Sequence, residues 1–99
     1  MRVSISPLAE RDLEAIGDYI AQDFPVRAAR FVAELRQQCD TIGRAPQAYR
    51  LRPELGEGVR SCAHGNYVIF YVATKSRVTV VRVLHGAMDI PARFPPESQ

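Results

Sequence analysis

Arginine is the side chain with the clearest chemical potential in this sequence. Twelve of the 13 basic residues are arginine, and only Lys75 is lysine. Residues 1–43 hold five arginines and seven acids, a balance of −2, whereas residues 44–99 hold eight bases and four acids, a balance of +4. Because a guanidinium binds carboxylates and phosphates through a planar fork, the basic C-terminal half favours an anionic partner. That partner is either an acidic protein segment or a nucleic acid.

A group of these arginines is predicted to line one basic surface beside a sheet. Its members are Arg44, Arg50, Arg52, Arg60 and Arg82. Such a surface suits a phosphate backbone or an acidic peptide. The alternative is that these are solvated charges scattered over a loop.

Arg82 and His85 lie three residues apart on a predicted strand. Side chains alternate between the two faces of a strand, so this spacing puts them on opposite faces unless a bulge intervenes. Arg82 is then expected to share its face with Val78, Val80 and Leu84, and His85 to share the other with Thr79, Val81 and Val83. A regular strand argues against an acid–base pair. For Arg82, an ion pair within the fold and a contact with a partner are equally good interpretations. His85 is expected to lie at the end of the strand and to hydrogen-bond to the backbone.

Motifs for nucleotide, metal or hydrolytic chemistry are missing from the sequence. It contains no Gly-x-Gly-x-x-Gly, Walker loop, His-Glu-x-x-His or Gly-x-Ser-x-Gly pattern. The two cysteines, Cys39 and Cys62, have no metal-ligand spacing and are expected to be buried, reduced thiols. We therefore predict neither a metal nor a cofactor.

Hydrophobic periodicity and turn residues predict the elements that must position these side chains. A strand is expected at 2–6, and Ser6-Pro7 then starts an amphipathic helix over 7–22. Pro25 starts a second helix that ends near Gly43. An ordered loop with room for one turn of helix follows over 44–58. Further strands are expected at 59–63, 67–74 and 78–85.

This order, β-α-α-β-β-β, predicts a two-layer α+β domain. An antiparallel helical hairpin would cover one face of a four-stranded sheet whose last three strands form an antiparallel meander. With 99 residues we expect a single domain, at 1–90, and a loosely held C-terminal tail at 91–99. The longest apolar run, Tyr67–Ala73, is too short to span a membrane, and Met1–Ile5 has no signal-peptide character, so we expect a cytoplasmic protein.

Several segments, in order, resemble the ParE branch of the RelE/ParE toxin superfamily. They are Ser4–Ile16, Ala28–Leu35, Arg44–Arg50, Gly58–Cys62, Asn66–Val72 and Val80–Ile90. The resemblance covers roughly residues 2–90 and implies the β-α-α-β-β-β fold reached above. One departure stands out: many ParE-like sequences have a basic residue at the position of Met88, between Ala87 and Asp89.

The resemblance implies the toxin of a type II toxin–antitoxin pair. ParE-like toxins are associated with inhibition of DNA gyrase and are neutralised by a ParD-like antitoxin in a hetero-oligomer. That complex represses its own operon and contacts operator DNA only through the antitoxin. The residues expected to bind antitoxin or target are Arg50, Arg52, Arg60, Arg82, His85, Met88 and Asp89, with Leu13, Ile16 and Phe31 from the helices.

The alternative is a RelE-like, ribosome-dependent mRNA endonuclease. RNA cleavage needs a general acid, a general base and cations at the scissile phosphate. Arg60, Arg82 and His85 would have to supply them. Because lysine is nearly absent and the end of the last strand matches the ParE pattern, we favour a toxin without catalytic residues. A binding module that has lost its toxicity is a further alternative.

Overall fold

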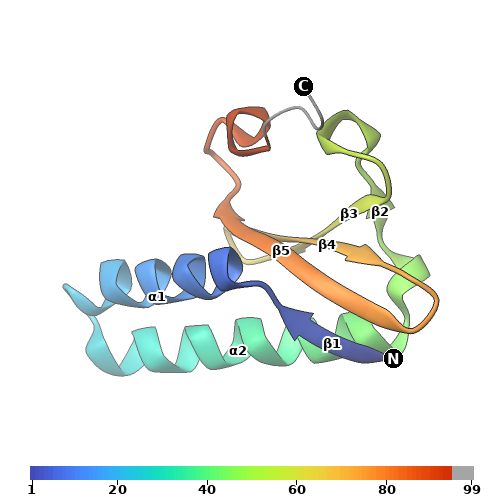
Figure 1. Ribbon diagram of the computed structural model, residues 1–99. Coiled ribbons are helices and arrows are strands. Elements are labelled where there is room, and N and C mark those ends of the chain that lie inside the picture. Colours follow the sequence, from blue (N-terminus) through green and yellow to red (C-terminus); the bar gives the residue numbers. More distant parts are fainter. Residues whose placement is uncertain (95–99) are drawn as a thin grey trace.

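The computed structural model describes residues 1–94 and shows helices and a sheet in two layers (Figure 1). Strand β1 (Arg2–Ile5) leads into helices α1 (Pro7–Ala21) and α2 (Pro25–Arg44). Strands β2 (Arg50–Leu51), β3 (Val59–His64), β4 (Tyr67–Ala73) and β5 (Arg77–His85) follow. The described residues also include three short 3₁₀ turns: η1 (Pro46–Ala48), η2 (Pro53–Leu55) and η3 (Ile90–Arg93). The predicted α+β class is confirmed, and the predicted helices and strands occur in the predicted order, with β2 in addition.

The sheet has the strand order β1-β5-β4-β3-β2. β1 runs parallel to β5, and every other neighbouring pair is antiparallel, as expected for the predicted meander. The sheet has five strands rather than the predicted four, because β2 forms inside the segment that was expected to be a loop. Both residues of β2 are exposed, so no alternation in the sequence signals this strand.

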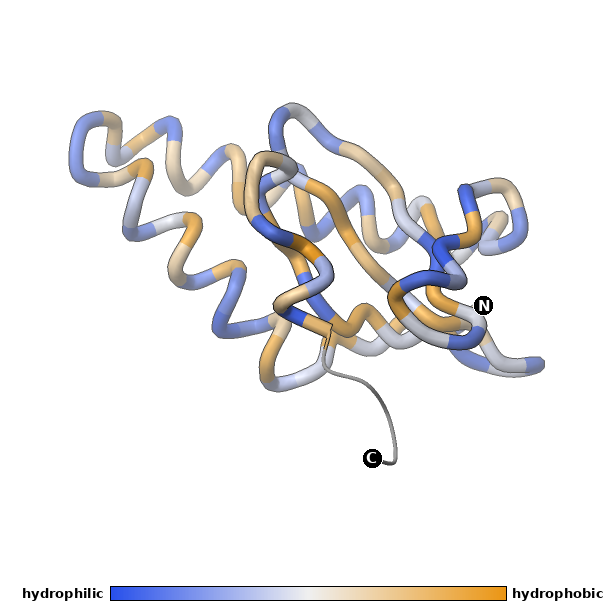
Figure 2. The backbone as a smooth tube through the Cα atoms, turned by 90° about the horizontal axis from the view of Figure 1, so that it is seen from above, coloured by the Kyte–Doolittle hydropathy of each residue, from blue (hydrophilic) through white to orange (hydrophobic). Residues whose placement is uncertain are grey.

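Helix α1 begins at the predicted cap. The Ala9 N–H donates to Ser6 Oγ at 3.1 Å, and Pro7 occupies the first helical position. Ala9, Leu13 and Ile16 form its buried stripe. Figure 2 shows hydrophobic and hydrophilic residues alternating along both helices, as expected of helices with one buried face. The two helices therefore pack on one side of the sheet and form the larger part of the core.

The opposite face of the sheet has a smaller core of its own. Leu55 from η2 and Ile90 from η3 pack there against Phe70 of β4, with Leu84 beside them. The Phe70 and Phe94 rings meet edge to face at 5.2 Å between centroids. The first part of the predicted tail, residues 91–94, thus belongs to η3 and this packing; residues 95–99 lie outside the described residues.

A β-bulge interrupts β5 where it pairs with β4. Phe70 lies opposite Arg82 but Tyr71 lies opposite Val80, so Val81 is the extra residue. The bulge changes which side chains share a face. Periodicity alone cannot place a bulge, because the inserted residue is itself an ordinary β-branched strand residue.

The bulge overturns part of the predicted face assignment of β5. Val78 and Val80 belong to the helix-side core, whereas Leu84 belongs to the small core on the other face. Arg82 lies opposite Phe70 of that small core, so it shares a face with Leu84 but not with the two valines. Beyond the bulge Val83 packs on the helix side. The predicted face of Arg82 was therefore wrong for Val78 and Val80. The predicted face of His85 was wrong as well, because Val81 packs on the small core and Thr79 lies opposite Val72 of that core, whereas Val83 packs on the helix side. Each side of a bulge has its own alternation.

The two thiols are free and buried, as predicted. Burial raises the pKa of Cys39 from 9.0 to about 11 and also raises that of Cys62, which accepts a hydrogen bond from Gln38 Nε2. The folded state favours the neutral thiols, so the stability they contribute is present below pH 9 and is lost as the pH rises toward 11. We expect alkylation by iodoacetamide at pH 8 to be slower than in denaturant by at least about tenfold. Equal rates would contradict this packing.

Candidate functional site

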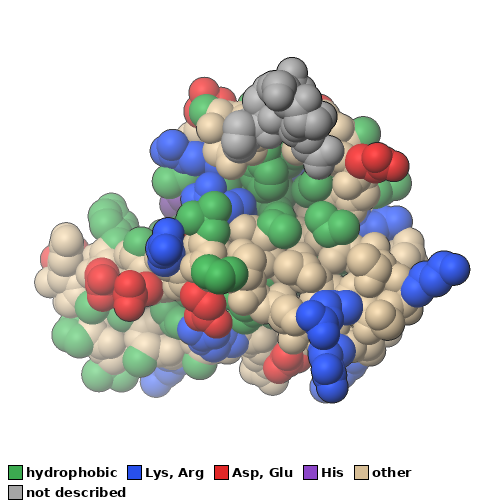
Figure 3. All heavy atoms as spheres, viewed as in Figure 1, with side chains coloured by type: hydrophobic (Ala, Val, Ile, Leu, Met, Phe, Trp, Pro, Cys, Tyr) green, Lys and Arg blue, Asp and Glu red, His purple; other side chains and the backbone are tan. Residues whose placement is uncertain are grey.

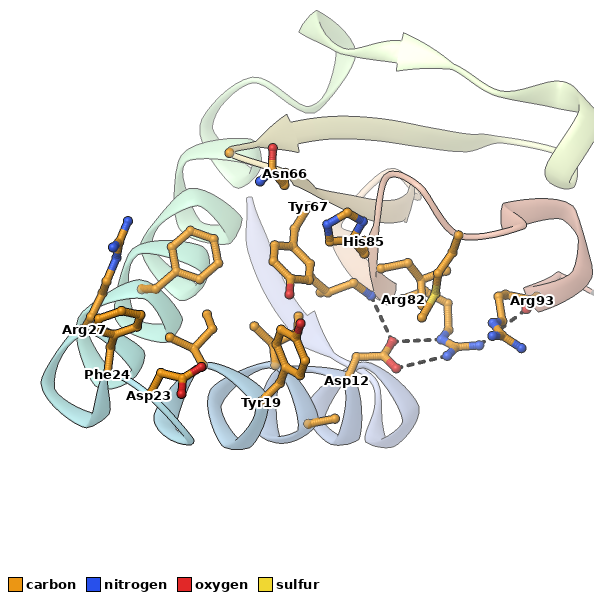
Figure 4. Close-up of a pocket in the computed structure, with 18 of the residues that line it drawn as sticks. Asp12, Tyr19, Asp23, Phe24, Arg27, Asn66, Tyr67, Arg82, His85 and Arg93 are labelled. Carbon is orange, nitrogen blue, oxygen red and sulfur yellow. Dashed lines mark hydrogen bonds and ion pairs between the residues drawn. The ribbon is translucent and has the colours of Figure 1, made fainter.

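A cleft of about 1280 Å³ opens between the helical hairpin and the free end of β5 (Figure 4). Its walls come from α1, the start of α2, the β3–β4 turn, the end of β5 and η3. Its lining is Asp12, Ala15, Ile16, Tyr19, Ile20, Asp23, Phe24, Arg27, Phe31, Gly65, Asn66, Tyr67, Arg82, Val83, Leu84, His85, Met88, Ala92 and Arg93.

The cleft exists because β1 is shorter than β5. β1 pairs with β5 only as far as Val80, and the chain then turns away into α1. Ser6 closes this end by donating its N–H to Val80 O and its hydroxyl to Val81 O. Beyond the bulge, β5 has a partner strand on one side only, so its outer edge lines the cleft.

Asp12 of α1 occupies part of that open edge. Its Oδ2 accepts from Val83 N–H at 2.9 Å and from Arg82 Nε at 2.8 Å, and its Oδ1 accepts from Arg82 Nη2 at 3.0 Å. The two side chains of the pair are only 12% and 16% exposed. Bonding to Asp12 raises the pKa of Arg82 further above its ordinary value. Arg82 also donates to Arg93 O at 3.4 Å, so the Asp12–Arg82 pair connects α1, β5 and η3.

Aromatic and apolar side chains form the rest of the cleft. Tyr19 and Phe24 are 69% and 56% exposed, far more than a core position allows. Phe31 packs against Tyr67 at 5.6 Å between ring centroids, and burial raises the pKa of Tyr67. Apolar surface with a few polar groups at its rim is the usual composition of a site for a protein segment.

His85 is held by the backbone at the end of β5, as predicted for a strand-end histidine. Its Nδ1 accepts from Ala87 N–H at 3.0 Å, and its ring meets Tyr67 edge to face at 5.1 Å. Because Nδ1 accepts this bond, Nε2 is the ring nitrogen left to donate. His85 therefore offers the cleft a single donor.

The predicted basic surface is divided in the structure. Arg50 and Arg82 lie in one row across the sheet but three strand spacings apart, about 14 Å. Arg52 lies beside Arg50, where it pairs with Glu54 at 2.7 Å and stacks over the Phe70 ring at 5.8 Å. These groups do not converge.

Arg60 lies on the helix-facing side of the same sheet. It donates to Tyr49 O at 2.6 Å and to Gln47 Oε1 at 2.7 Å, which fastens the connector between α2 and β3. Arg44 ends α2 and is exposed. Only Arg82 of the predicted arginines lines the cleft.

The predicted apolar contacts differ in how much surface they present. Leu13 is fully buried in the core and presents none to a partner. Ile16 is 7% exposed and, with Phe31 and Met88, lines the cleft. Asp89 precedes η3, where its carbonyl accepts from Ala92 N–H. Three of the four predicted apolar contacts thus line the cleft, and Leu13 is inaccessible; Arg82 and His85 bring the predicted site residues in the lining to five.

Sequence reasoning missed much of the cleft. Tyr19 lies outside the buried stripe of α1, and Phe24 directly precedes α2, so an aromatic residue away from the stripes is a signal that could have found both. Asp12, Arg27 and Arg93 carry no such signal, because nothing local distinguishes them from other charged residues. Asp12 lies 70 residues from Arg82 in the sequence, and only the fold brings them together.

Among residues 1–94, no helix is long and apolar enough to cross a bilayer. Within the same residues, no three His, Cys, Asp or Glu side chains come close enough to hold a metal ion.

Comparisons with known proteins give the chain its family. Residues 3–90 match the family model described as the ParE toxin of the type II toxin–antitoxin system, parDE. Toxin ParE1 of Caulobacter vibrioides is 35% identical over 91 residues, which cover 91% of this chain and 94% of that protein. Toxin ParE1 of Mycobacterium tuberculosis is 33% identical, covering 90% and 93%.

Two solved structures have the same fold. One is the chromosomal ParDE toxin–antitoxin system from P. aeruginosa, with a TM-score of 0.74, 19% identity, and coverage of 86% of this chain and 95% of that one. The other is the RelBE2 toxin–antitoxin complex from Mycobacterium tuberculosis, with a TM-score of 0.64, 26% identity, and coverage of 85% and 95%. The resemblance noted in the sequence is confirmed, and this chain belongs to the ParE toxin family of type II toxin–antitoxin systems.

Proposed function

We propose that this toxin inhibits DNA gyrase and that a ParD-like antitoxin neutralises it by occupying the cleft. The observation that carries the proposal is the cleft itself, a large apolar hollow with exposed Tyr19 and Phe24 on its rim. Monomeric proteins rarely expose apolar surface of this kind without a partner. The solved structures with this fold include toxins together with their antitoxins.

The cleft suits an amphipathic antitoxin segment. Such a segment places its apolar stripe in a groove and keeps its polar face in solvent. Here the buried Ile16 and Leu84 and the half-buried Phe31 line the cleft together with the two exposed aromatics. An antitoxin that orders on binding spends conformational entropy, which the burial of apolar surface offsets.

The other expected partnerships follow from the same complex. Toxin and antitoxin form a hetero-oligomer in the cytoplasm, and it represses their operon. DNA contact is made by the antitoxin alone.

The arrangement of the arginines favours binding over RNA cleavage. Arg60 lies opposite Tyr71 of β4, and His85 lies opposite Tyr67 of the same strand. Tyr67 and Tyr71 are four residues apart along β4, which is about 13 Å. Arg82 is engaged by Asp12. An acid, a base and cations for one phosphate must converge within hydrogen-bond reach, and these three side chains do not.

A pair of assays with purified protein tests the proposal. The toxin is expected to inhibit supercoiling by gyrase, and equimolar antitoxin is expected to restore it. A ribosome-dependent mRNA cleavage assay runs beside it and is expected to show no cuts. Codon-dependent cleavage with unaffected gyrase would overturn the proposal in favour of the RelE-like activity. No effect in either assay would indicate a module that has lost its toxicity.

A further inference from the structure

The charged side chains of the cleft lie at its two ends, and the net charge of the two ends differs. Figure 4 places Arg93 beside Arg82 and Asp12 at one end, and Arg27 with Asp23 and Phe24 at the other. Figure 3 shows arginine and histidine side chains gathered at the hollow between the helical layer and the C-terminal segments. Apolar and aromatic residues separate the two ends.

Among the residues that line the cleft, those at the end near η3 carry one surplus positive charge. Asp12 and Arg82 form a tight pair whose charges cancel. Arg93 is exposed, and among residues 1–94 its guanidinium has neither an ion pair nor a hydrogen-bonded acceptor. Only its carbonyl is engaged, by Arg82. Asp12 already satisfies Arg82, so an incoming carboxylate meets Arg93 first.

The end at the helical hairpin is electrically balanced. Arg27 faces the ring of Phe24 at 5.8 Å, and the carboxylate of Asp23 lies at the same end. The two charges offset one another there without a direct ion pair within 4 Å. The cleft is therefore positive at one end and neutral at the other.

We propose that Arg93 is a specificity-determining residue. It forms an ion pair with a carboxylate of the antitoxin segment and so sets the direction in which that segment lies in the cleft. The inference rests on the proposed docking of an antitoxin. A segment with its acidic residues at one end of an apolar stripe gains attraction in one orientation and loses it in the reverse. Electrostatic complementarity of this kind contributes more to orientation and specificity than to raw affinity.

The experiment measures binding of the co-encoded antitoxin to three variants of equal charge change. Arg93→Glu is expected to weaken binding by about three- to tenfold at low salt, since an exposed ion pair becomes a repulsion. Arg27→Glu, at the balanced end, is expected to have the smaller effect. Arg30→Glu is the matched control, because Arg30 lies on α2 outside the cleft.

A charge swap then tests direction. Acid-to-lysine changes at one end of the antitoxin's apolar stripe are expected to restore binding to Arg93→Glu, and the same changes at the other end are not. Equal effects of all three toxin variants, or rescue from either end, would overturn the inference and leave antitoxin binding intact. An antitoxin that fails to bind the wild type would instead refute the proposed function.

Discussion

Replacing Asp12 by alanine is expected to destabilise the protein by about 2–4 kcal/mol, because the change leaves a nearly buried guanidinium without its counter-charge and a backbone N–H without its acceptor. Arg82 is 16% exposed, and both it and Val83 N–H depend on this one carboxylate. Denaturant unfolding measures the effect. Asp18→Ala is the matched control, since Asp18 is exposed on the same helix and lines no part of this cleft.

A second variant separates two contributions to the free energy of unfolding: the cost of leaving Arg82 without its counter-charge, and the net contribution of the ion pair. Arg82→Met combined with Asp12→Ala removes both charges and keeps the stem of the arginine, so we expect it to recover part of the lost stability. A free energy of unfolding for Asp12→Ala equal to that of Asp18→Ala would contradict a role for Asp12 in joining α1, β5 and η3.

Much of the fold could be predicted from local sequence patterns. Ser6-Pro7 marks the start of α1, and Pro25 marks the start of α2. The buried stripes of both helices follow from apolar residues spaced three and four apart. The three long strands are β-branched or aromatic runs between turn residues. Each of these signals acts within a few residues, and together they fix the element order and the layers.

The features that build the cleft are not local. The bulge at Val81 changes the facing of Arg82, and the short β1 leaves the edge of β5 open only because the chain turns into α1 at Ser6. The pairing of Asp12 with Arg82 joins positions 70 residues apart. The sequence alone could not show that Arg50 and Arg82 lie on strands that the strand order separates, so both were predicted on one basic surface.

The largest functional effect is expected from removing the two exposed aromatics of the cleft. Tyr19→Ala with Phe24→Ala should weaken antitoxin binding by about 100-fold or more, since buried aromatic anchors often contribute about 2 kcal/mol each at an interface. Calorimetric titration with antitoxin measures the affinity. Growth of cells that co-express both proteins gives a second readout, because toxin released from its antitoxin stops growth.

Folding should survive this change, because Tyr19 and Phe24 are 69% and 56% exposed and add little to the core. Val26→Ala is the matched control: Val26 is 76% exposed at the same hairpin but lies outside the cleft. If the antitoxin binds the double variant and Val26→Ala with the wild-type affinity, the cleft is not its docking site. If binding is lost and gyrase inhibition by the free toxin persists, then antitoxin and target use separable contacts on this surface.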